Sequence, residues 1–298
     1  MANLCNLDGE ILPESEARVP VLDRGFLFGD SVYEVIRTRA GVPFAWPEHL
    51  SRLRSSAAGI SMELDLDDRA VMRRIAETLA AAGNEESYVR IIVSRGTGSE
   101  PNIDLSCAPG PCRWAILVRS LAPRPRGQLN IRIVERLRND RRALDPAVKS
   151  GNYLNNVLGL AEARSAGASD ALFLNHEGRI TEASTSNVFS VKNGAIRTPF
   201  LRAGILAGIT RMLLLDCCRR AGLDAGEEDL TADDLRAADE VFVTSTLRDL
   251  APVATLDGVP VPGGAPGPVT AELSKLFESY CAARAAELYG PELERLLA

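Results

Sequence analysis

The segment Val148-Lys149-Ser150-Gly151-Asn152-Tyr153 contains the residue on which the interpretation of this sequence depends. Lys149 is one of only three lysines among 34 lysines and arginines, so arginine supplies nearly all of the positive charge. A lysine amine can lose its proton and attack a carbonyl, whereas a guanidinium stays charged. Rarity alone does not distinguish a reactive lysine from a solvated one, which is the commoner kind, so the neighbouring motifs have to decide.

The composition is typical of a soluble globular protein of about two domains, with 298 residues, 46% of them hydrophobic and 25% charged. A net charge of -6 leaves no basic surplus for a nucleic acid partner. No signal-peptide pattern and no apolar run of membrane-spanning length is present, so we expect a cytoplasmic protein without a membrane partner. Six scattered cysteines and two histidines predict neither a disulfide framework nor a metal centre.

We expect two domains, over 1–120 and 129–298, joined by a short proline-rich linker over 121–128. The arginine-rich run 136–142 is expected to be a solvated face. Hydrophobic periodicity predicts both kinds of regular structure. Strands are predicted over 31–37, 88–94, 114–119, 129–135, 170–175, 187–191 and 240–245, and helices over 47–60, 67–82, 153–166, 208–220 and 269–287.

Four segments carry groups with chemical potential. Lys149 precedes a predicted helix at a strand end, where helical spacing would place Tyr153 beside it. Glu182 lies in a run of small polar residues between two apolar strands, and if buried it would need a cationic partner such as a protonated ring nitrogen. Residues 204–211 place glycines before a helix start, where backbone N–H groups can bind an anion. The hydroxyls of 244–246 follow a strand and suit a phosphate, a carboxylate or an ordinary turn.

Together these segments resemble the class IV aminotransferases, which depend on pyridoxal 5'-phosphate. The matching motifs occur in order between about residues 20 and 255, namely 29–37, 49–53, 149–154, 181–189 and 204–211. The resemblance implies the two-domain fold type IV, a mixed α+β and α/β fold with a small α/β N-terminal domain. It also implies a larger C-terminal domain with a barrel-like β core, and a homodimer.

The resemblance further implies residues that hold the cofactor. Lys149 would form the Schiff base with its aldehyde and then move the substrate proton. Glu182 would keep the ring nitrogen protonated, so that the ring acts as an electron sink, and Tyr153 would hydrogen-bond the ring hydroxyl. Arg52 would clamp the phosphate. Further cofactor contacts are expected at a helix start and a strand end, from Ile209, Thr210, Ser245 and Thr246.

The substrate motifs disagree. Residues 29–37 are most similar to D-amino-acid aminotransferases, but these enzymes and the aminodeoxychorismate lyases would carry a carboxylate-binding arginine beyond 95–97. This chain has Glu100 and no arginine over 98–102. In contrast, Tyr88-Val89-Arg90 resembles the Tyr-x-Arg element of branched-chain aminotransferases, with Ile91 where a proline usually follows. In that family the tyrosine helps to bind the α-carboxylate and the arginine receives the side-chain carboxylate of glutamate.

We therefore expect transfer of an amino group between an L-branched-chain amino acid and 2-oxoglutarate. A D-amino-acid aminotransferase, an amine transaminase and an aminodeoxychorismate lyase are the alternatives within the family. The expected substrate contacts are Tyr33, Arg37, Tyr88, Arg90, Thr246 and Leu247. For Arg37 a structural ion pair is an equal alternative, Tyr33 could also belong to the core, and His49 is expected to pack at a helix start.

The sequence argues against functions of two other classes. A cofactor-binding regulatory protein without turnover would not need the intact set of Lys149, Tyr153 and Glu182. A glycine-rich nucleotide-binding enzyme would need a strand, a Gly-x-Gly-x-x-Gly turn and a helix in succession, and this sequence contains no such unit.

Overall fold

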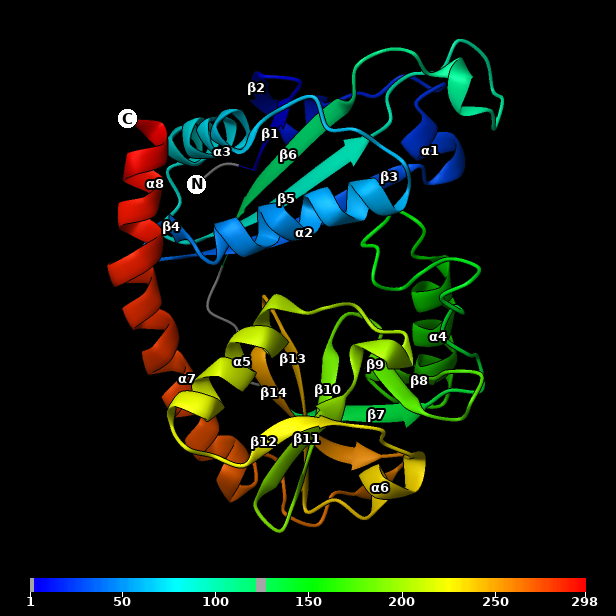
Figure 1. Cartoon of the computed structure of the whole chain (residues 1–298), viewed down its shortest axis with the longest axis vertical. Helices are drawn as coiled ribbons and strands as arrows, with labels where there is room; N and C mark the ends of the chain where they lie inside the picture. Colours follow the sequence, from blue (N-terminus) through cyan, green and yellow to red (C-terminus); the bar gives the residue numbers. More distant parts are fainter. Residues whose placement is uncertain (1–2, 122–126) are drawn as a thin grey trace. The chain divides into compact units, whose positions relative to one another are not determined.

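The computed structural model describes residues 3–121 and 127–298. Most of the predicted linker, 122–126, lies outside these described residues. Contacts divide the chain into two compact units (Figure 1). Unit 1 comprises Met1–Pro123, Val148–Asn152 and Ala282–Ala298, and unit 2 comprises Arg124–Ala147 and Tyr153–Cys281. The segment around Lys149 is grouped with unit 1 because its backbone pairs with a strand of that unit.

Unit 1 is built on a six-stranded antiparallel sheet with the strand order β2-β1-β6-β5-β3-β4. The long helices α2 and α3 pack against this sheet. On β5 the fully buried Val89, Ile91 and Val93 alternate with the half-buried Tyr88, Arg90 and Ile92, as the period of two of a strand requires. The elements are β1 (Leu4–Leu7), β2 (Glu10–Pro13), α1 (Arg24–Phe28), β3 (Ser31–Arg39), β4 (Val42–Pro43), α2 (Trp46–Gly59), α3 (Asp68–Ala82), β5 (Ser87–Ser94) and β6 (Arg113–Ser120).

Local chemistry explains where the helices of unit 1 begin and end. The side chain of Asp67 accepts a hydrogen bond from the Ala70 N–H and so caps the start of α3. Gly83 ends this helix in the left-handed conformation, with φ of 61°, which favours glycine. Pro47 lies in the first turn of α2, where its missing N–H costs no intrahelical bond.

Unit 2 contains a nine-stranded sheet, six of whose strands close into a barrel. The order β12-β11-β10-β13-β14-β7-β8-β9 is joined by a further pairing of β9 with β10. A core cluster that includes Leu172, Val188, Val241, Val243 and Val253 packs within this sheet, so the expected barrel-like core is confirmed. The elements are β7 (Leu129–Ile133), α4 (Leu154–Ser165), β8 (Asp170–Leu174), β9 (Ile180–Ala183), β10 (Asn187–Lys192), β11 (Ala195–Pro199), α5 (Ile209–Arg220), β12 (Ala225–Glu228), α6 (Ala232–Arg236), β13 (Glu240–Ser245), β14 (Asp249–Leu256), β15 (Val259–Pro260) and α7 (Pro268–Arg284).

The predicted strands and helices are all present, with boundaries shifted by a few residues. The predicted final helix ends earlier, at Arg284, and continues as a π-helical turn over Ala285–Tyr289 and then as α8 (Gly290–Leu297). Several elements that are short, polar or without a clear period were not predictable from the sequence, namely β1, β2, α1, β9, β11, β12, α6, β14 and β15. In the described part of the chain, no helix combines the length and the apolar character that crossing a bilayer would need.

Candidate active site

In unit 1, the backbone of the Lys149 segment is bound to the first residues of β3. The Tyr33 N–H donates to the Lys149 carbonyl at 3.0 Å, and the Gly151 N–H donates to the Ser31 carbonyl at 2.7 Å. The Lys149 N–H donates to Ser56 Oγ on α2 at 3.1 Å. Lys149 is therefore fixed by a strand and a helix of the same unit, although it belongs to neither.

These contacts of Lys149 with β3 and α2 correct two expectations about this residue. Within the described residues 127–298, no regular strand immediately precedes it, since β7 ends at Ile133 and only an isolated bridge joins Ser150 to the sheet. Helix α4 begins at Leu154 with Tyr153 as its N-cap residue, so the helical-spacing argument for the contact between Lys149 and Tyr153 does not apply. The sequence could not show this, because the pairing partner of the segment lies more than a hundred residues earlier in the chain.

The Tyr33 ring lies beside two cations. The Lys149 Nζ is 4.4 Å from the ring centroid and 3.4 Å from the Tyr33 hydroxyl, and the Arg90 guanidinium carbon is 4.2 Å from the centroid. Cation–π contacts of this kind contribute about 0.5–2 kcal/mol each. Unit 1 thus brings together the predicted reactive lysine and two of the predicted substrate residues.

The other predicted substrate residues of unit 1 lie on the same strand pair. Arg37 is directly opposite Tyr88, and Val35 is directly opposite Arg90. Because directly opposed residues share a face of the sheet, Arg37, Tyr88 and Arg90 lie on the Tyr33 face. Their side chains are half-buried.

On the other face of β3, Glu34 joins two side chains of α2. Its carboxylate accepts hydrogen bonds from Arg52 Nε at 2.7 Å and Arg52 Nη2 at 2.8 Å, and His49 Nδ1 lies 2.7 Å away. Burial by itself would raise the pKa of the Glu34 carboxyl, but Arg52 and His49 outweigh it and hold this pKa far below its ordinary value. Burial lowers the pKa of His49, so the ring is neutral and donates its Nδ1 proton. His49 packs near the helix start, as expected.

The segment that lacks the expected arginine is held by an arginine from elsewhere, Arg24 on α1. The buried Arg24 guanidinium donates to the carbonyls of Asn102 at 2.6 Å, Ile103 at 3.0 Å and Asp104 at 3.1 Å. Its Nε donates to Asp30 at 2.8 Å. Arg24 was not among the predicted site residues, because nothing in its local sequence distinguishes a buried arginine from a solvated one.

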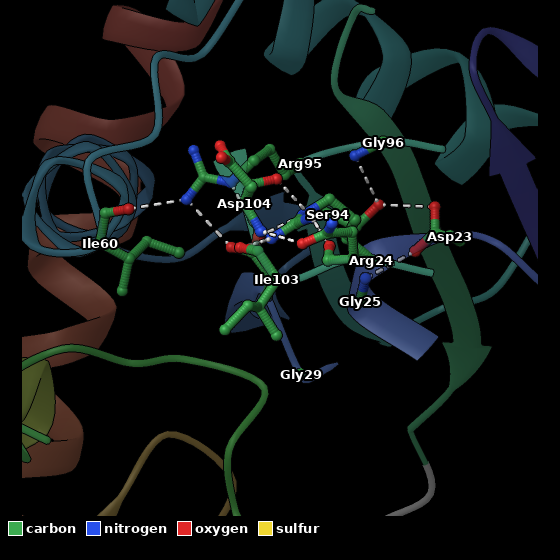
Figure 2. Close-up of polar contacts among 12 residues, drawn as sticks. Asp23, Arg24, Gly25, Gly29, Ile60, Ser94, Arg95, Gly96, Ile103 and Asp104 are labelled. Atoms are coloured by element: carbon green, nitrogen blue, oxygen red, sulfur yellow. Dashed lines mark hydrogen bonds and ion pairs between the residues drawn. The ribbon is translucent and has the colours of Figure 1, made fainter. Parts of the chain in front are cut away.

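A second arginine continues this network toward α2. Arg95 donates to both carboxylate oxygens of Asp30, at 2.8 and 3.0 Å. It also donates to the carbonyl of Ser61 at 2.8 Å and to the carbonyl of Ile60 at 2.7 Å, and the Ile60 contact is drawn in Figure 2. Burial alone would raise the pKa of Asp30, but Arg95 and Arg24 lower it. The segment after Arg95 is therefore tied into unit 1 by ionised groups.

In unit 2, Glu182 is buried and already has two donors. Arg138 Nε donates to one carboxylate oxygen at 2.9 Å, and the Leu206 N–H donates to the other at 2.9 Å. The Arg138 side chain is only 7% exposed, so the expectation that the run 136–142 is solvated is wrong at this position. A buried carboxylate recruits a cation to offset its desolvation, and this cation lies 44 residues away in the sequence.

Glu182 and Asn187 together fix the loop before α5. Asn187 Nδ2 donates to the Leu206 carbonyl at 3.0 Å, so side chains bind both backbone groups of Leu206. A Cβ on Gly208 would collide with Asn187 Oδ1, so any larger residue there would displace the Asn187 amide. Helix α5 begins at Ile209, and no side chain of the described residues caps its first N–H groups.

The predicted hydroxyl cluster lies at the end of β13 in unit 2. Thr244 is opposite Asn187 in the ladder, and its buried Oγ1 has no hydrogen-bond partner among the described residues. Ser245 ends the strand, and its carbonyl accepts from the Arg248 N–H at 3.2 Å. Thr246 and Leu247 therefore lie in the turn between β13 and β14.

Comparison with known proteins identifies the family. The model of the family "Amino-transferase class IV" matches residues 31–256. A protein of Methanocaldococcus jannaschii, provisionally named a branched-chain-amino-acid aminotransferase, is 36% identical over 91% of this chain and 94% of its own length. The D-alanine aminotransferase of Bacillus licheniformis is 33% identical over 91% of this chain and 95% of its own length.

A solved structure agrees with these sequence relatives. The T.th. branched-chain amino acid aminotransferase, complexed with N-(5'-phosphopyridoxyl)-L-glutamate, superposes with a TM-score of 0.88 and 29% identity. The match covers 97% of each chain. The chain belongs to the class IV aminotransferases and has their fold type IV, and it is a transaminase that depends on pyridoxal phosphate.

The residues present fit this cofactor in each unit taken separately. An ionised carboxylate offers about four acceptor sites, so Glu182 can accept from a ring N–H in addition to Arg138 and Leu206. The uncapped start of α5 suits a phosphate, and the unpartnered Thr244 hydroxyl offers one more polar contact. The described residues contain no cluster of histidine, cysteine and acidic side chains that could hold a metal ion.

Proposed function

We propose that this transaminase transfers the amino group between an L-branched-chain amino acid and 2-oxoglutarate. The observation that carries the proposal is the stacking of Arg90 on the Tyr33 ring that the Lys149 amine also contacts. A cation beside the reactive amine can receive the second carboxylate of 2-oxoglutarate. The solved relative that is complexed with a phosphopyridoxyl derivative of L-glutamate supports this choice.

The same face of the sheet also suits an apolar side chain. Val35 is opposite Arg90 on β3, Leu117 is opposite Arg90 on β6, and Ile92 is opposite Tyr33. All three are half-buried. An apolar wall with one cation on a flexible stem accepts a branched chain when the cation withdraws and a carboxylate when it approaches.

Bound pyridoxal phosphate would supply a carbonyl that captures the substrate amine and a ring that withdraws electrons. Lys149 Nζ would attach to the cofactor and would take and return the α-proton of the substrate, with Tyr33 orienting the amine. Glu182 would hold the proton on the ring nitrogen, and Tyr153 would donate to the ring hydroxyl. Arg52 would bind the phosphate.

The remaining contacts are proposed from backbone and hydroxyl groups. The N–H groups of Ile209 and Thr210, with the hydroxyls of Ser245 and Thr246, would complete the phosphate site. The backbone of Thr246 and Leu247, together with Tyr88 and Arg37, would hold the α-carboxylate.

A D-amino-acid aminotransferase is the second candidate, because the 33% identical D-alanine aminotransferase and residues 29–37 both favour it. Its expected carboxylate-binding arginine has no counterpart over 98–102, and Arg24 is engaged with Asp30 and three carbonyls.

We also propose a homodimer. Large apolar side chains are exposed on both units, including Phe26 at 68% and Ile103 at 78% on unit 1 and Leu154 at 65% on unit 2. Light scattering at micromolar concentration tests the dimer.

The test of the substrate measures the two half-reactions separately with L-leucine, 2-oxoglutarate and D-alanine. Arg90→Gln should lower kcat/KM for 2-oxoglutarate about 10- to 100-fold, because a charge-assisted hydrogen bond is lost, and should change the leucine half-reaction only a few-fold. Arg132→Gln, at an exposed arginine of β7, is the matched control. Turnover of D-alanine without turnover of leucine would overturn the assignment.

A further inference from the structure

We propose that Glu34 is a positioning residue that fixes the Arg52 guanidinium for the phosphate of the cofactor, and that His49 fixes Glu34 in turn. The inference rests on the proposed role of Arg52 in binding that phosphate. It assigns a function to a carboxylate that touches neither substrate nor cofactor.

The geometry of Glu34 shows a group committed to its neighbours. Its side chain is fully buried, Arg52 is 11% exposed and His49 is 1% exposed. Arg52 offers its Nε and Nη2 to the two carboxylate oxygens, at 2.7 and 2.8 Å, as a bidentate pair. This pair fixes the plane of the guanidinium.

His49 prevents the carboxylate from rotating. Its Nδ1 lies 2.7 Å from Glu34 Oε2, the oxygen that Arg52 Nη2 also contacts. The Val35 N–H is a further donor to this oxygen, at 3.3 Å. With donors from β3 and from two turns of α2, the carboxylate has one orientation.

One stripe of α2 connects this triad to the reactive lysine. His49, Arg52 and Ser56 are spaced by three and four residues, so they lie on one face of the helix. Ser56 Oγ accepts from the Lys149 N–H at 3.1 Å, whereas Arg52 is fixed through Glu34. The helix face therefore sets the distance between the Arg52 side chain and the backbone of Lys149.

Two effects of Glu34 on an anion at Arg52 oppose each other. Its negative charge repels a phosphate, so removal of the charge alone would tighten binding. Its hydrogen bonds remove the rotational freedom that a long arginine side chain would otherwise lose on binding. The second effect dominates, because the bidentate hydrogen bonds hold the Arg52 guanidinium in a single orientation.

The experiment compares two ligands that differ only in the phosphate. Full-length protein freed of cofactor is titrated with pyridoxal phosphate and with pyridoxal, and both Kd values are measured by absorbance. Glu34→Gln should weaken pyridoxal phosphate at least about 10-fold and change the Kd of pyridoxal less than about 2-fold. Arg52→Lys should show the same selectivity. In the variant that carries both substitutions, the Kd of pyridoxal phosphate should be at most about 3-fold higher than in the single variant that binds it less tightly.

The matched control is another buried glutamate. Glu240 is 2% exposed and accepts from the N–H groups of Val269 and Thr270 at the start of α7. Glu240→Gln should lower Tm without changing the ratio of the two Kd values. If Glu34→Gln does not fold, Glu34→Asp keeps the charge but shortens the reach, and His49→Asn loosens the carboxylate. Both should weaken pyridoxal phosphate selectively, by about 3- to 10-fold.

Equal weakening of both ligands by these variants would reduce Glu34 to a structural role and overturn the inference. Tighter binding of pyridoxal phosphate by Glu34→Gln would also overturn it, since charge would then dominate. Failure of the proposed cofactor attachment gives a different result. In that case borohydride would fix no cofactor on the wild-type peptide that contains Lys149.

Discussion

Glu34 in unit 1 and Glu182 in unit 2 are both buried carboxylates paired with an arginine, yet they differ in what they can still bind. Glu34 receives two hydrogen bonds from Arg52, one from His49 and a longer one from the Val35 N–H. Glu182 receives one from Arg138 and one from a backbone N–H. With about four acceptor sites per carboxylate, Glu34 is nearly saturated, whereas Glu182 retains room for a ligand. Burial and charge pairing alone therefore do not distinguish the carboxylate proposed to position Arg52 from the one proposed to bind the cofactor.

The surroundings explain this difference. Glu34 lies in the middle of the regular strand β3, which α2 covers, so protein donors surround it. Glu182 lies on the short strand β9 beside the loop that leads into α5, where Arg138 and Leu206 are its donors in the described part of the chain.

The largest effect should come from removing the bond that would hold the cofactor. Lys149→Ala should lower transamination at least about 10³-fold, because both the attachment and the proton carrier are lost. Stopped-flow half-reactions with leucine measure this loss. Lys192→Ala, at an exposed lysine that pairs with Asp239, is the control and should keep full activity. Retained activity in Lys149→Ala would remove the basis of every role proposed here.

The next largest effect should come from Glu182→Gln. A neutral amide cannot hold the ring proton, so kcat should fall about 10²- to 10³-fold. The amide also leaves the buried Arg138 without its counter-charge, which should cost about 3 kcal/mol of stability. Glu34→Gln sharpens the contrast, because it should act mainly on the affinity for pyridoxal phosphate. A Glu182→Gln enzyme with an unchanged rate would mean that the two carboxylates do not differ in function.

A smaller effect is expected from a substitution that releases the segment after Arg95. This substitution tests whether another buried ion pair of unit 1, that of Arg24 with Asp30, stabilises the fold. Arg24→Met removes the donors to three carbonyls and to Asp30, and should lower stability by about 3 kcal/mol. Limited proteolysis should then cut within 98–111 faster than in the wild type. Arg18→Met, at an exposed arginine that also contacts two carbonyls, is the control and should change stability by less than about 0.5 kcal/mol.

The smallest effect is a pH dependence from His49 and Glu34. The pKa of His49 is lowered by folding, so the unfolded chain binds a proton first and stability declines as the pH falls below about 6.5. The pKa of Glu34 is also lowered, so its contribution is complete above about 4.5 and declines in more acidic solution. Between pH 7.5 and 5.5, the Tm of His49→Asn should therefore fall by roughly 2 °C less than the Tm of the wild type. Calorimetry measures this slope, with His176→Asn as the exposed control. A steeper slope in His49→Asn would contradict a neutral His49.

The sequence was informative where function depends on residue identity within a local motif. The neighbouring motifs made Lys149 a candidate, and the surrounding polar run made Glu182 one. The structure places donors around Glu182 and the Tyr33 ring beside Lys149. Regular elements such as α3 were predictable because their caps and periodicity are local.

Partners that folding brings from far away in the sequence were not predictable. Arg138 was assigned to a solvated run, because only folding places it beside Glu182, 44 residues away. Arg24 looked like any arginine, although its partners lie about 80 residues further along the chain. Glu34 was part of a matching motif without an assigned role, because its partners Arg52 and His49 come from a different element.

The barrel of unit 2 closes where β9 pairs with β10, and the ladder between these two strands contains one residue pair, Glu182 with Asn187. One residue pair constrains this closure only weakly. The side chains of the same two residues constrain it further, because Glu182 binds the Leu206 N–H and Asn187 binds the Leu206 carbonyl. The closure of the barrel and the proposed contact with the cofactor ring thus involve the same residue, Glu182. A substitution of Glu182 that is meant to change the reaction should therefore also make the closure of the barrel less rigid. Activity and stability have to be measured separately in such a variant.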